Sequence, residues 1–299
     1  MRVFVIGAAG MLGSAFHNFF VTNNIEAKEY DINLTDSYIN YLDIRNYYDL
    51  SLEVDLFKPD LIINLAALTD LEFCEKNSED CYATNYYGTE NLAVLSSHHN
   101  IPFVYISTAG VFDGTKDSYF CFDKPNPINL YGHSKYLGEQ VVQNLCEKYF
   151  IFRAGWMMGG GLGNNGKDKK FLKKIFNQIQ LGEKVLYVVD DKYGTPTYTE
   201  DFAKNVMRVL KTKRYGLYNQ TNTGFGSRLD VAQFFLECLG LDKEINIKKV
   251  ASDFFSKDFF ANRPESEKLI NFNLRQLDLE MPDWKKSLSE YVRSENIKV

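Results

Sequence analysis

The chain has 299 residues, 45% of them hydrophobic and 24% charged, with a formal net charge of −5 at pH 7. This length and composition are typical of a globular protein that buries a large core, as one α/β domain or as one domain with a smaller lobe. The acidic balance argues against a nucleic-acid partner, because nucleic-acid-binding domains carry an excess of Lys and Arg.

The cysteines and histidines show no pattern of a disulfide framework or a metal site. The five cysteines form no Cys-x-x-Cys pair, and the four histidines lack metal-ligand spacing. We expect free thiols in a reducing compartment. No apolar run is long enough to cross a bilayer, and the apolar N-terminus lacks a convincing signal-peptide cleavage site. We therefore predict a cytoplasmic protein with no metal and no membrane partner; a homodimer is one option for its assembly.

A glycine-rich turn follows the first apolar run. Residues 3–6 (VFVI) are typical of a strand buried on both faces, and Gly7, Gly10 and Gly13 follow before an apolar pattern with helical spacing. Backbone N–H groups of such a turn, together with the helix N-terminus, attract an anion. We predict a dinucleotide diphosphate site with contacts from Gly7, Gly10, Met11 and Leu12; the alternative is an ordinary glycine-rich turn.

The spacing Gly-x-x-Gly-x-x-Gly resembles that of the short-chain dehydrogenase/reductase superfamily. The resemblance implies a Rossmann-type fold and, further along the chain, a catalytic Tyr and Lys.

The second predicted strand, at residues 27–31, ends in an acid. Asp31 stands where dinucleotide-binding folds place the carboxylate that accepts hydrogen bonds from the adenosine ribose. Because an acid there repels a 2′-phosphate, Asp31 favours NADH over NADPH, although a solvated turn aspartate is the alternative. Asp43 and Ile44 resemble the segment that borders the adenine in the superfamily.

Further strands and helices alternate as far as about residue 155. Residues 60–67 form a predicted buried strand, and Leu65, Ala66 and Ala67 at its end would let a cofactor lie against the backbone. A helix is predicted at 80–99 and a strand at 104–108, ending in Ser107 and Thr108. The alternation predicts a doubly wound parallel α/β sheet.

Shorter elements follow: helices at 169–181, 199–210, 227–239 and 283–292, and a strand at 184–189. We predict a dinucleotide-binding domain at residues 1–155, to which some later elements return. Residues 156–299 would be mainly a substrate-binding lobe over the ligand edge of the sheet.

The candidate catalytic residues lie in the segment YGHSK at 131–135, which opens a predicted helix. Tyr131 and Lys135 are four residues apart and therefore share one helix face. A nearby ammonium is expected to lower the pKa of the phenol, so that Tyr131 can act as a general acid on a carbonyl oxygen. The Thr108 hydroxyl would bind the same oxygen.

Taken together, these motifs resemble the dTDP-4-dehydrorhamnose reductase family, an extended branch of the superfamily. The resemblance spans nearly the whole chain and includes residues 7–13, 64–70, 107–114, 131–135, 188–198, 216–219 and 263–264. It implies that NADPH or NADH delivers hydride to the C4 carbonyl of a nucleotide-linked 4-keto-6-deoxyhexose, in deoxysugar and surface-polysaccharide synthesis. Tyr131 would protonate the resulting oxyanion, and Lys135 would also bind the nicotinamide ribose. The implied substrate contacts include Thr108, Val111 and Phe112.

Two further substrate contacts are candidates in the C-terminal part. Trp156 could stack on the sugar or fill the core, and Arg263 could bind a substrate phosphate or form a surface ion pair.

Two departures from the family affect the predicted substrate. Ala109 and Gly110 replace an acid and an aromatic residue beside Thr108, which enlarges that wall and makes it less polar. Residues 156–167 are richer in glycine than the family's equivalent and are followed by lysines. This loop could close over a nucleotide diphosphate or be a solvated surface loop.

Two other functions fit parts of the pattern. A nucleotide-sugar epimerase or dehydratase of the same superfamily shares the Tyr, Lys and Thr set. A non-catalytic NAD(P)-binding regulatory subunit is the alternative from another class, since a regulatory subunit of methionine adenosyltransferase resembles this family. Intact Thr108, Tyr131 and Lys135 argue against it, because only chemistry requires all three.

Overall fold

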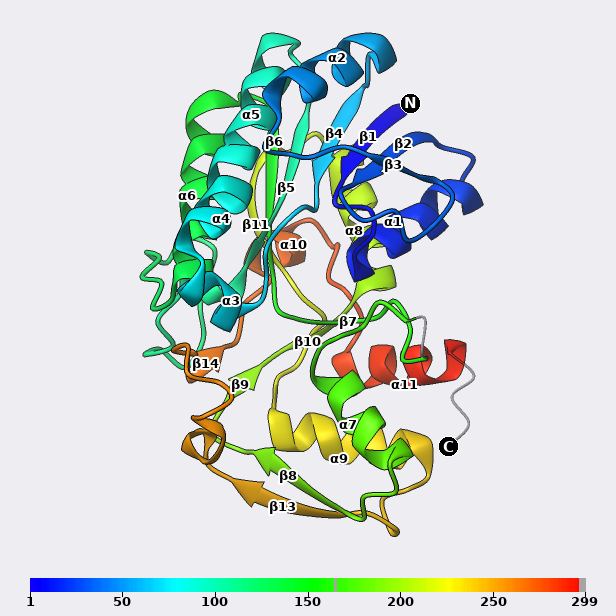
Figure 1. Cartoon of the computed structure of the whole chain (residues 1–299), viewed down its shortest axis with the longest axis vertical. Coiled ribbons are helices and arrows are strands. Elements are labelled where there is room, and N and C mark those ends of the chain that lie inside the picture. Colours follow the sequence, from blue (N-terminus) through cyan, green and yellow to red (C-terminus); the bar gives the residue numbers. More distant parts are fainter. Residues whose placement is uncertain (164–165, 296–299) are drawn as a thin grey trace.

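A computed structural model of the chain describes residues 1–163 and 166–295 and shows two tiers (Figure 1). The upper tier is a seven-stranded sheet in the order β11-β6-β5-β4-β1-β2-β3, in which every neighbouring pair is parallel. The strands are β1 (Arg2–Ile6), β2 (Glu26–Asp31), β3 (Ile39–Tyr41), β4 (Leu61–Asn64), β5 (Phe103–Thr108), β6 (Tyr149–Ala154) and β11 (Gly216–Gln220). The predicted doubly wound α/β sheet is confirmed.

Helices cover both faces of this sheet. One face carries α1 (Met11–Thr22) and α8 (Thr199–Lys211), and the other carries α2 (Tyr47–Phe57), α5 (Gly88–His98) and α6 (Leu130–Leu145) (Figure 1). In β1, Val3 and Val5 pack into the core on the α1 side, whereas Phe4 and Ile6 pack into the core on the α5 side. Burial on both faces is why this strand is an unbroken apolar run.

The helix expected at residues 80–99 is divided. It begins as α4 (Ser78–Tyr82), passes through a π-helical turn (Ala83–Tyr87) and continues as α5; α3 (Leu71–Lys76) precedes it. Asn85, in the π-helical turn, is fully buried, and its amide donates to the Leu68 carbonyl and to the Ser134 hydroxyl on α6. The turn therefore aims a polar side chain at the helix that carries Tyr131 and Lys135.

The lower tier has its own core and three small sheets. Its elements are β7 (Trp156–Met158) with β10 (Pro196–Tyr198), β9 (Tyr193–Gly194) with β12 (Gly226–Ser227) and β14 (Ser266–Glu267), β8 (Val185–Val189) with β13 (Asn246–Val250), and the helices α7 (Phe171–Gln180), α9 (Arg228–Leu239) and α11 (Trp284–Ser294). The chain re-enters the upper tier at α8, β11 and α10 (Phe272–Gln276), which packs against β11.

The strand order places the predicted functional segments at one edge. Strand β1 lies between β2 and β4, so the connections leave it in opposite directions, and ligands bind at such a reversal beside the carboxyl ends of the strands. The glycine turn after β1, Leu65 after β4 and Thr108 at the end of β5 all lie at this edge.

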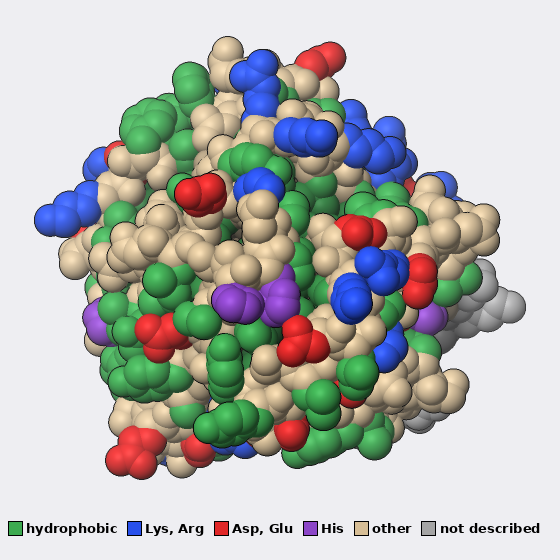
Figure 2. Space-filling model, turned by 90° about the horizontal axis from the view of Figure 1, so that it is seen from above, with side chains coloured by type: hydrophobic (Ala, Val, Ile, Leu, Met, Phe, Trp, Pro, Cys, Tyr) green, Lys and Arg blue, Asp and Glu red, His purple; other side chains and the backbone are tan. Residues whose placement is uncertain are grey.

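The surface shows no strong charge bias on the face seen from above. Acidic and basic side chains are scattered there among apolar and uncharged ones (Figure 2). Within residues 1–163 and 166–295, none of the helices combines the length and the apolar character that a membrane span requires.

Candidate active site

The glycine turn fits a dinucleotide diphosphate. Gly7 has φ +90°, and a Cβ at this position would lie 2.3 Å from the Ala66 backbone nitrogen, so no other residue is accommodated between β1 and the segment after β4. Gly10 precedes α1 without any described side chain capping the helix, and no acidic residue stands in the first turn. The N–H groups of Met11 and Leu12 therefore begin a helix whose positive end is uncovered by its own side chains.

Asp31 lies beside this turn at the end of β2. One carboxylate oxygen accepts a hydrogen bond from the Ala9 backbone N–H at 3.0 Å, and the other accepts from the Asn33 N–H at 2.9 Å. Asp31 thus holds the glycine turn and also brings negative charge to the place where an adenosine ribose lies in this fold. The position of Asp31 is compatible with both predicted roles, as a turn aspartate and as an acceptor of hydrogen bonds from the ribose.

Asp43 and Ile44, predicted to border the adenine, lie after β3, and residues 65–67 follow β4. The Arg45 guanidinium binds both carboxylate oxygens of Asp43 and lowers the pKa of that carboxyl. Ile44 is buried against Gly88 of α5. The Asp43 side chain is therefore already bound to Arg45.

The predicted catalytic residues come together at the end of β5. The Asn129 side chain caps α6 by accepting from the Gly132 N–H at 2.7 Å, and a Cβ at Gly132 would lie 2.1 Å from the Gly110 carbonyl oxygen. This close approach seats the start of α6 on the turn after β5. A Cβ at Gly110 would be 3.4 Å from the Thr108 hydroxyl oxygen and 3.9 Å from the Tyr131 ring, so Thr108 and Tyr131 flank one spot.

The pKa of Tyr131 differs from the sequence-based expectation. Burial raises it to about 12, and interaction with the Thr108 hydroxyl offsets only part of the shift. Lys135, which is 3% exposed, has its pKa lowered by burial to about 7. Loss of hydration disfavours the charged form of each group, so the acidification of Tyr131 that the four-residue spacing suggests is not seen.

A buried ion pair behind Thr108 was not anticipated. Both carboxylate oxygens of Glu139 bind the Arg153 guanidinium, at 2.8 and 2.7 Å, and the Ser107 hydroxyl donates to Glu139. The two side chains of the ion pair are 1% and 3% exposed. The pair joins α6, β5 and β6, and Glu139 lies one helical turn beyond Lys135. Glu139 follows Lys135 by four residues, as Lys135 follows Tyr131. This spacing, which places all three on one helix face, was the signal available in the sequence.

The side chains of Val111 and Phe112 pack into the protein beside the predicted site. Both side chains are fully buried, and the Phe112 ring stacks on Tyr119 with centroids 4.2 Å apart. Their side chains form a packed layer behind the site, since aromatic pairing and burial occupy their surfaces, and the expected contact with substrate stays a prediction.

Trp156 and Arg263 are both engaged by protein groups. The indole of Trp156 is 9% exposed, its N–H donates to Glu267 at 2.6 Å, and the Arg228 guanidinium lies 3.5 Å from the centre of its ring. Arg263 forms a two-bond ion pair with Glu72, at 2.8 and 2.9 Å. In the structure, therefore, Trp156 fills the core and Arg263 forms an ion pair, which were the alternatives to substrate contact. Arg228, which sequence reasoning missed, covers the indole.

The glycine-rich loop reaches the cofactor edge. A Cβ at Gly160 would lie 3.1 Å from the Met11 Cα, and the Lys167 amine pairs with Asp36 at 2.8 Å in the connection after β2. Lys170 donates to the Thr69 hydroxyl at 3.0 Å. The described part of the loop is thus held against the upper tier; Asn164 and Asn165, part of the segment singled out from sequence, lie outside the described residues.

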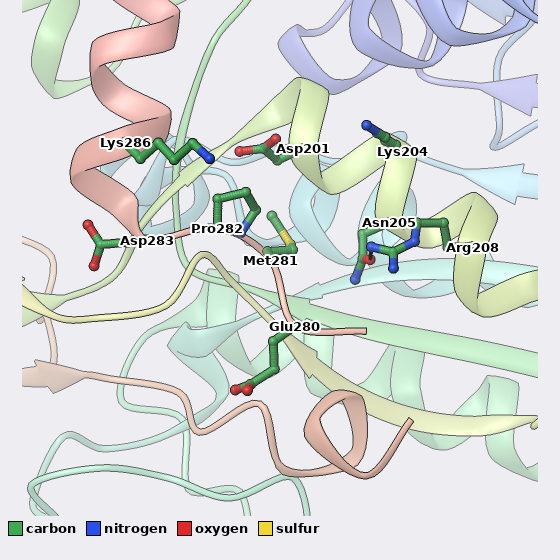
Figure 3. A pocket seen from close by; sticks show the side chains of 9 residues that line it. All are labelled: Asp201, Lys204, Asn205, Arg208, Glu280, Met281, Pro282, Asp283 and Lys286. Atoms are coloured by element: carbon green, nitrogen blue, oxygen red, sulfur yellow. Dashed lines mark hydrogen bonds between the residues drawn. The ribbon is translucent and has the colours of Figure 1, made fainter. Parts of the chain in front are cut away.

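The cavity shown in Figure 3 is distinct from these groups. It has a volume of about 380 Å³ and lies between α8, the segment before α11 and the start of that helix, with a mixed lining that includes Asp201, Lys204, Arg208 and Lys286. A second cavity of about 540 Å³ borders α1 and the glycine-rich loop. Neither lining includes Thr108, Tyr131 or Lys135.

Comparison with known proteins identifies the family. A sequence model described as the RmlD substrate binding domain matches residues 1–297. The chain belongs to this family. The resemblance inferred from its motifs is thereby confirmed.

Several similar proteins are named as reductases. The dTDP-4-dehydrorhamnose reductase of Aggregatibacter actinomycetemcomitans is 29% identical over 96% of this chain and 97% of its own length. The dTDP-4-keto-6-deoxy-D-glucose reductase of Streptomyces niveus is 32% identical over 84% and 83%. A crystal structure of dTDP-4-dehydrorhamnose reductase from Bacillus anthracis in complex with NADP has 32% identity and a TM-score of 0.88, and the match covers 98% of this chain and 99% of that one.

Proposed function

We propose that this chain is an NAD(P)H-dependent reductase of the C4 keto group of a nucleotide-linked 4-keto-6-deoxyhexose, acting in deoxysugar and polysaccharide synthesis. The observation that carries the proposal is the convergence of Thr108 and Tyr131 on one spot at the ligand edge of the sheet, in a chain of this reductase family. We assign the reaction to the cytoplasm.

Residues at the ligand edge of the sheet would hold the cofactor. The first turn of α1, with Gly7, Gly10, Met11 and Leu12, would bind the diphosphate, and Leu65, Ala66 and Ala67 would lie against the rest of the dinucleotide. Asp31 would accept hydrogen bonds from the adenosine ribose hydroxyls, so we propose a preference for NADH. A reduced nicotinamide supplies hydride to the carbonyl carbon when it is bound.

The protein's own residues would handle the carbonyl oxygen. The Thr108 hydroxyl donates a hydrogen bond to this oxygen as negative charge develops, and Tyr131 transfers its phenolic proton to it. A phenol with a pKa of about 12 is fully protonated at neutral pH, which is the form that an acid requires. An alkoxide is more basic than a phenolate, so the transfer is downhill. Lys135 would bind the nicotinamide ribose.

A direct assay tests the function. Purified protein is incubated with a panel of nucleotide-linked 4-keto sugars, and oxidation of NADH and NADPH is followed by absorbance with the product identified by NMR. We expect reduction of at least one 4-keto-6-deoxy sugar. Tyr131→Phe should lower kcat on the order of a hundred- to ten-thousand-fold while cofactor binding persists. The matched control is Tyr136→Phe, on the same helix, where the hydroxyl contacts only the Gln140 amide among the described residues.

Other outcomes point to the alternatives. Stoichiometric NAD retained through purification, with conversion of the sugar but no net cofactor oxidation, would indicate an epimerase or dehydratase. Full biological activity of the folded Tyr131→Phe protein would contradict any catalytic role.

A further inference from the structure

Arg228 stands at the junction of the small sheets in the lower tier. It is the first residue of α9 and directly follows β12, which pairs with β9, and β9 in turn pairs with β14. The register sets Gly226 and Glu267 on either side of Gly194. A Cβ at Gly194 would lie 2.4 Å from the Trp156 ring, so this strand supports the indole on which Arg228 rests.

The guanidinium of Arg228 is packed on aromatic rings. It lies 3.5 Å from the centre of the Trp156 ring and 5.0 Å from the centre of the Phe171 ring. In the described part of the chain, it forms no ion pair with a carboxylate. Stacking of this kind satisfies the flat faces of a guanidinium and leaves its N–H groups, which lie in the plane, available for hydrogen bonds.

Two other arginines near the site show the contrast. Arg153 and Arg263 each bind a carboxylate through two nitrogens, Glu139 and Glu72 respectively. Glu267, the acid whose charge acts on Arg228, accepts a hydrogen bond from the Trp156 indole. A partly buried cation without such a partner is costly unless a ligand supplies the negative charge.

Further positive charge lies close to Arg228. Burial lowers the pKa of Arg228 to about 10; the negative charge of Glu267 offsets part of this shift, and the positive charge of Arg263 adds to it. Burial lowers the pKa of Lys170, the charges of Asp70 and Asp168 offset part of this shift, and the positive charge of Arg228 adds to it. The Lys170 amine extends to Thr69 in the connection after β4. The charges of Arg263 and Lys170 thus act on Arg228, and an anion bound between these cations would relieve their mutual repulsion.

We propose that Arg228 binds the diphosphate of the nucleotide-linked substrate, with Lys170 as the second cation from the neighbouring loop. The assignment rests on the proposed function, which supplies a diphosphate-bearing substrate. The planar fork of an arginine suits two phosphate oxygens, and two separate cations suit the two charges of a diphosphate. Arg228 therefore takes the role that the sequence suggested for Arg263, because Arg263 is already paired with Glu72.

The test measures binding of dTDP, UDP and thymidine by calorimetry to the full chain saturated with NADH. We expect Arg228→Gln to weaken dTDP and UDP binding about tenfold to a hundredfold, the loss typical of a charged hydrogen bond to phosphate, and to leave thymidine binding unchanged. Arg228→Lys, which keeps the charge and much of the packing, should lose less. Arg208→Gln, which removes an exposed positive charge on α8, should bind all three ligands as the parent does.

Several results would overturn the assignment. Unchanged dTDP affinity in both Arg228 variants would do so, as would a parent protein that binds no nucleoside diphosphate. Unchanged dTDP affinity with lost preference for UDP-glucuronate over UDP-glucose would place a sugar carboxylate, not the diphosphate, at Arg228. Thermal melting and NADH affinity of each variant identify misfolding, in which case Arg228→Lys decides the matter.

The same proteins separate this inference from the proposed function. Reduction of keto sugars with an unchanged KM in Arg228→Gln would uphold the reductase and reject the role of Arg228. Arg228-dependent dTDP binding in a protein that reduces none of the sugars would uphold the role of Arg228 and reject the reductase.

Discussion

The Lys135 amine lies 4.1 Å from the centre of the Tyr105 ring, although its helix position aligns it with Tyr131. The contact arises because α6 packs tightly on β5: the Tyr105 hydroxyl donates to the Lys135 carbonyl, and a Cβ at Gly138 would lie 2.3 Å from that hydroxyl. An ammonium over an aromatic face keeps some electrostatic stabilisation, but it has lost most of its water.

This burial makes Lys135 a source of pH-dependent stability. Its pKa falls from 10.5 to about 7 on folding, so between these values the unfolded chain holds a proton that the native protein lacks. Burial of the charged Lys135 amine therefore lowers the free energy of unfolding by its full amount below pH 7. This destabilisation shrinks as the pH rises across the window. Lys135→Met should stabilise the protein by on the order of a few kcal/mol at pH 7 and by little near pH 10.

Urea unfolding of both proteins at the two pH values measures this difference. Because the comparison is between the variant and its parent at each pH, titration of other groups cancels. A constant difference in free energy between pH 7 and pH 10 would show that the native amine keeps its ordinary pKa.

Removing one partner of the Glu139–Arg153 pair should destabilise the protein far more than removing both. Glu139→Gln leaves a buried guanidinium uncompensated and should cost about 3–5 kcal/mol of unfolding free energy. The double variant Glu139→Leu with Arg153→Met should recover much of that loss, because neither charge is then left unpaired. Denaturant unfolding of the single and double variants provides the measurement.

An exposed ion pair serves as the control for this prediction. Arg275 and Glu280 lie 3.2 Å apart with side chains 61% and 32% exposed, so Glu280→Gln should cost less than about 1 kcal/mol. Equal losses in the Glu139 and Glu280 variants would mean that burial adds nothing.

Gly110 should control which sugars enter the site. The space that a Cβ would fill is in ordinary contact with Thr108 and Tyr131, so Gly110→Ala should fold normally and raise KM for the preferred sugar by about tenfold or less. Steady-state kinetics on two keto sugars of different size measures the effect, which should be larger for the bulkier one. Gly132→Ala, which would place its Cβ 2.1 Å from a carbonyl oxygen, should instead destabilise the protein.

Asp31 should set the cofactor preference. Asp31→Asn removes the negative charge that opposes a 2′-phosphate while an amide oxygen can still accept from the Ala9 N–H. We expect the ratio of kcat/KM for NADPH over NADH to rise by about tenfold, the scale of one charge contact. A ratio that does not move would assign Asp31 to the turn alone, and thermal melting then reports that structural role.

The local features of this protein were predictable from sequence. Residues 3–13 predict their strand, turn and helix because burial on both faces, glycine backbone freedom and helical periodicity act over a few positions. The same holds for Thr108 at a strand end and for Tyr131 and Lys135 on one helix face. Repetition of these local patterns was sufficient to predict the doubly wound sheet.

Tertiary structure alone decided how distant side chains pair and how deeply each is buried. Arg263 with Glu72, Arg228 with Trp156 and Glu139 with Arg153 join residues that no periodic pattern connects. The raised pKa of Tyr131 has the same origin, since desolvation depends on what all neighbouring elements cover, whereas helix spacing reports only one neighbour. The sequence supplies the side chains that can interact, and tertiary packing determines which of them are in contact.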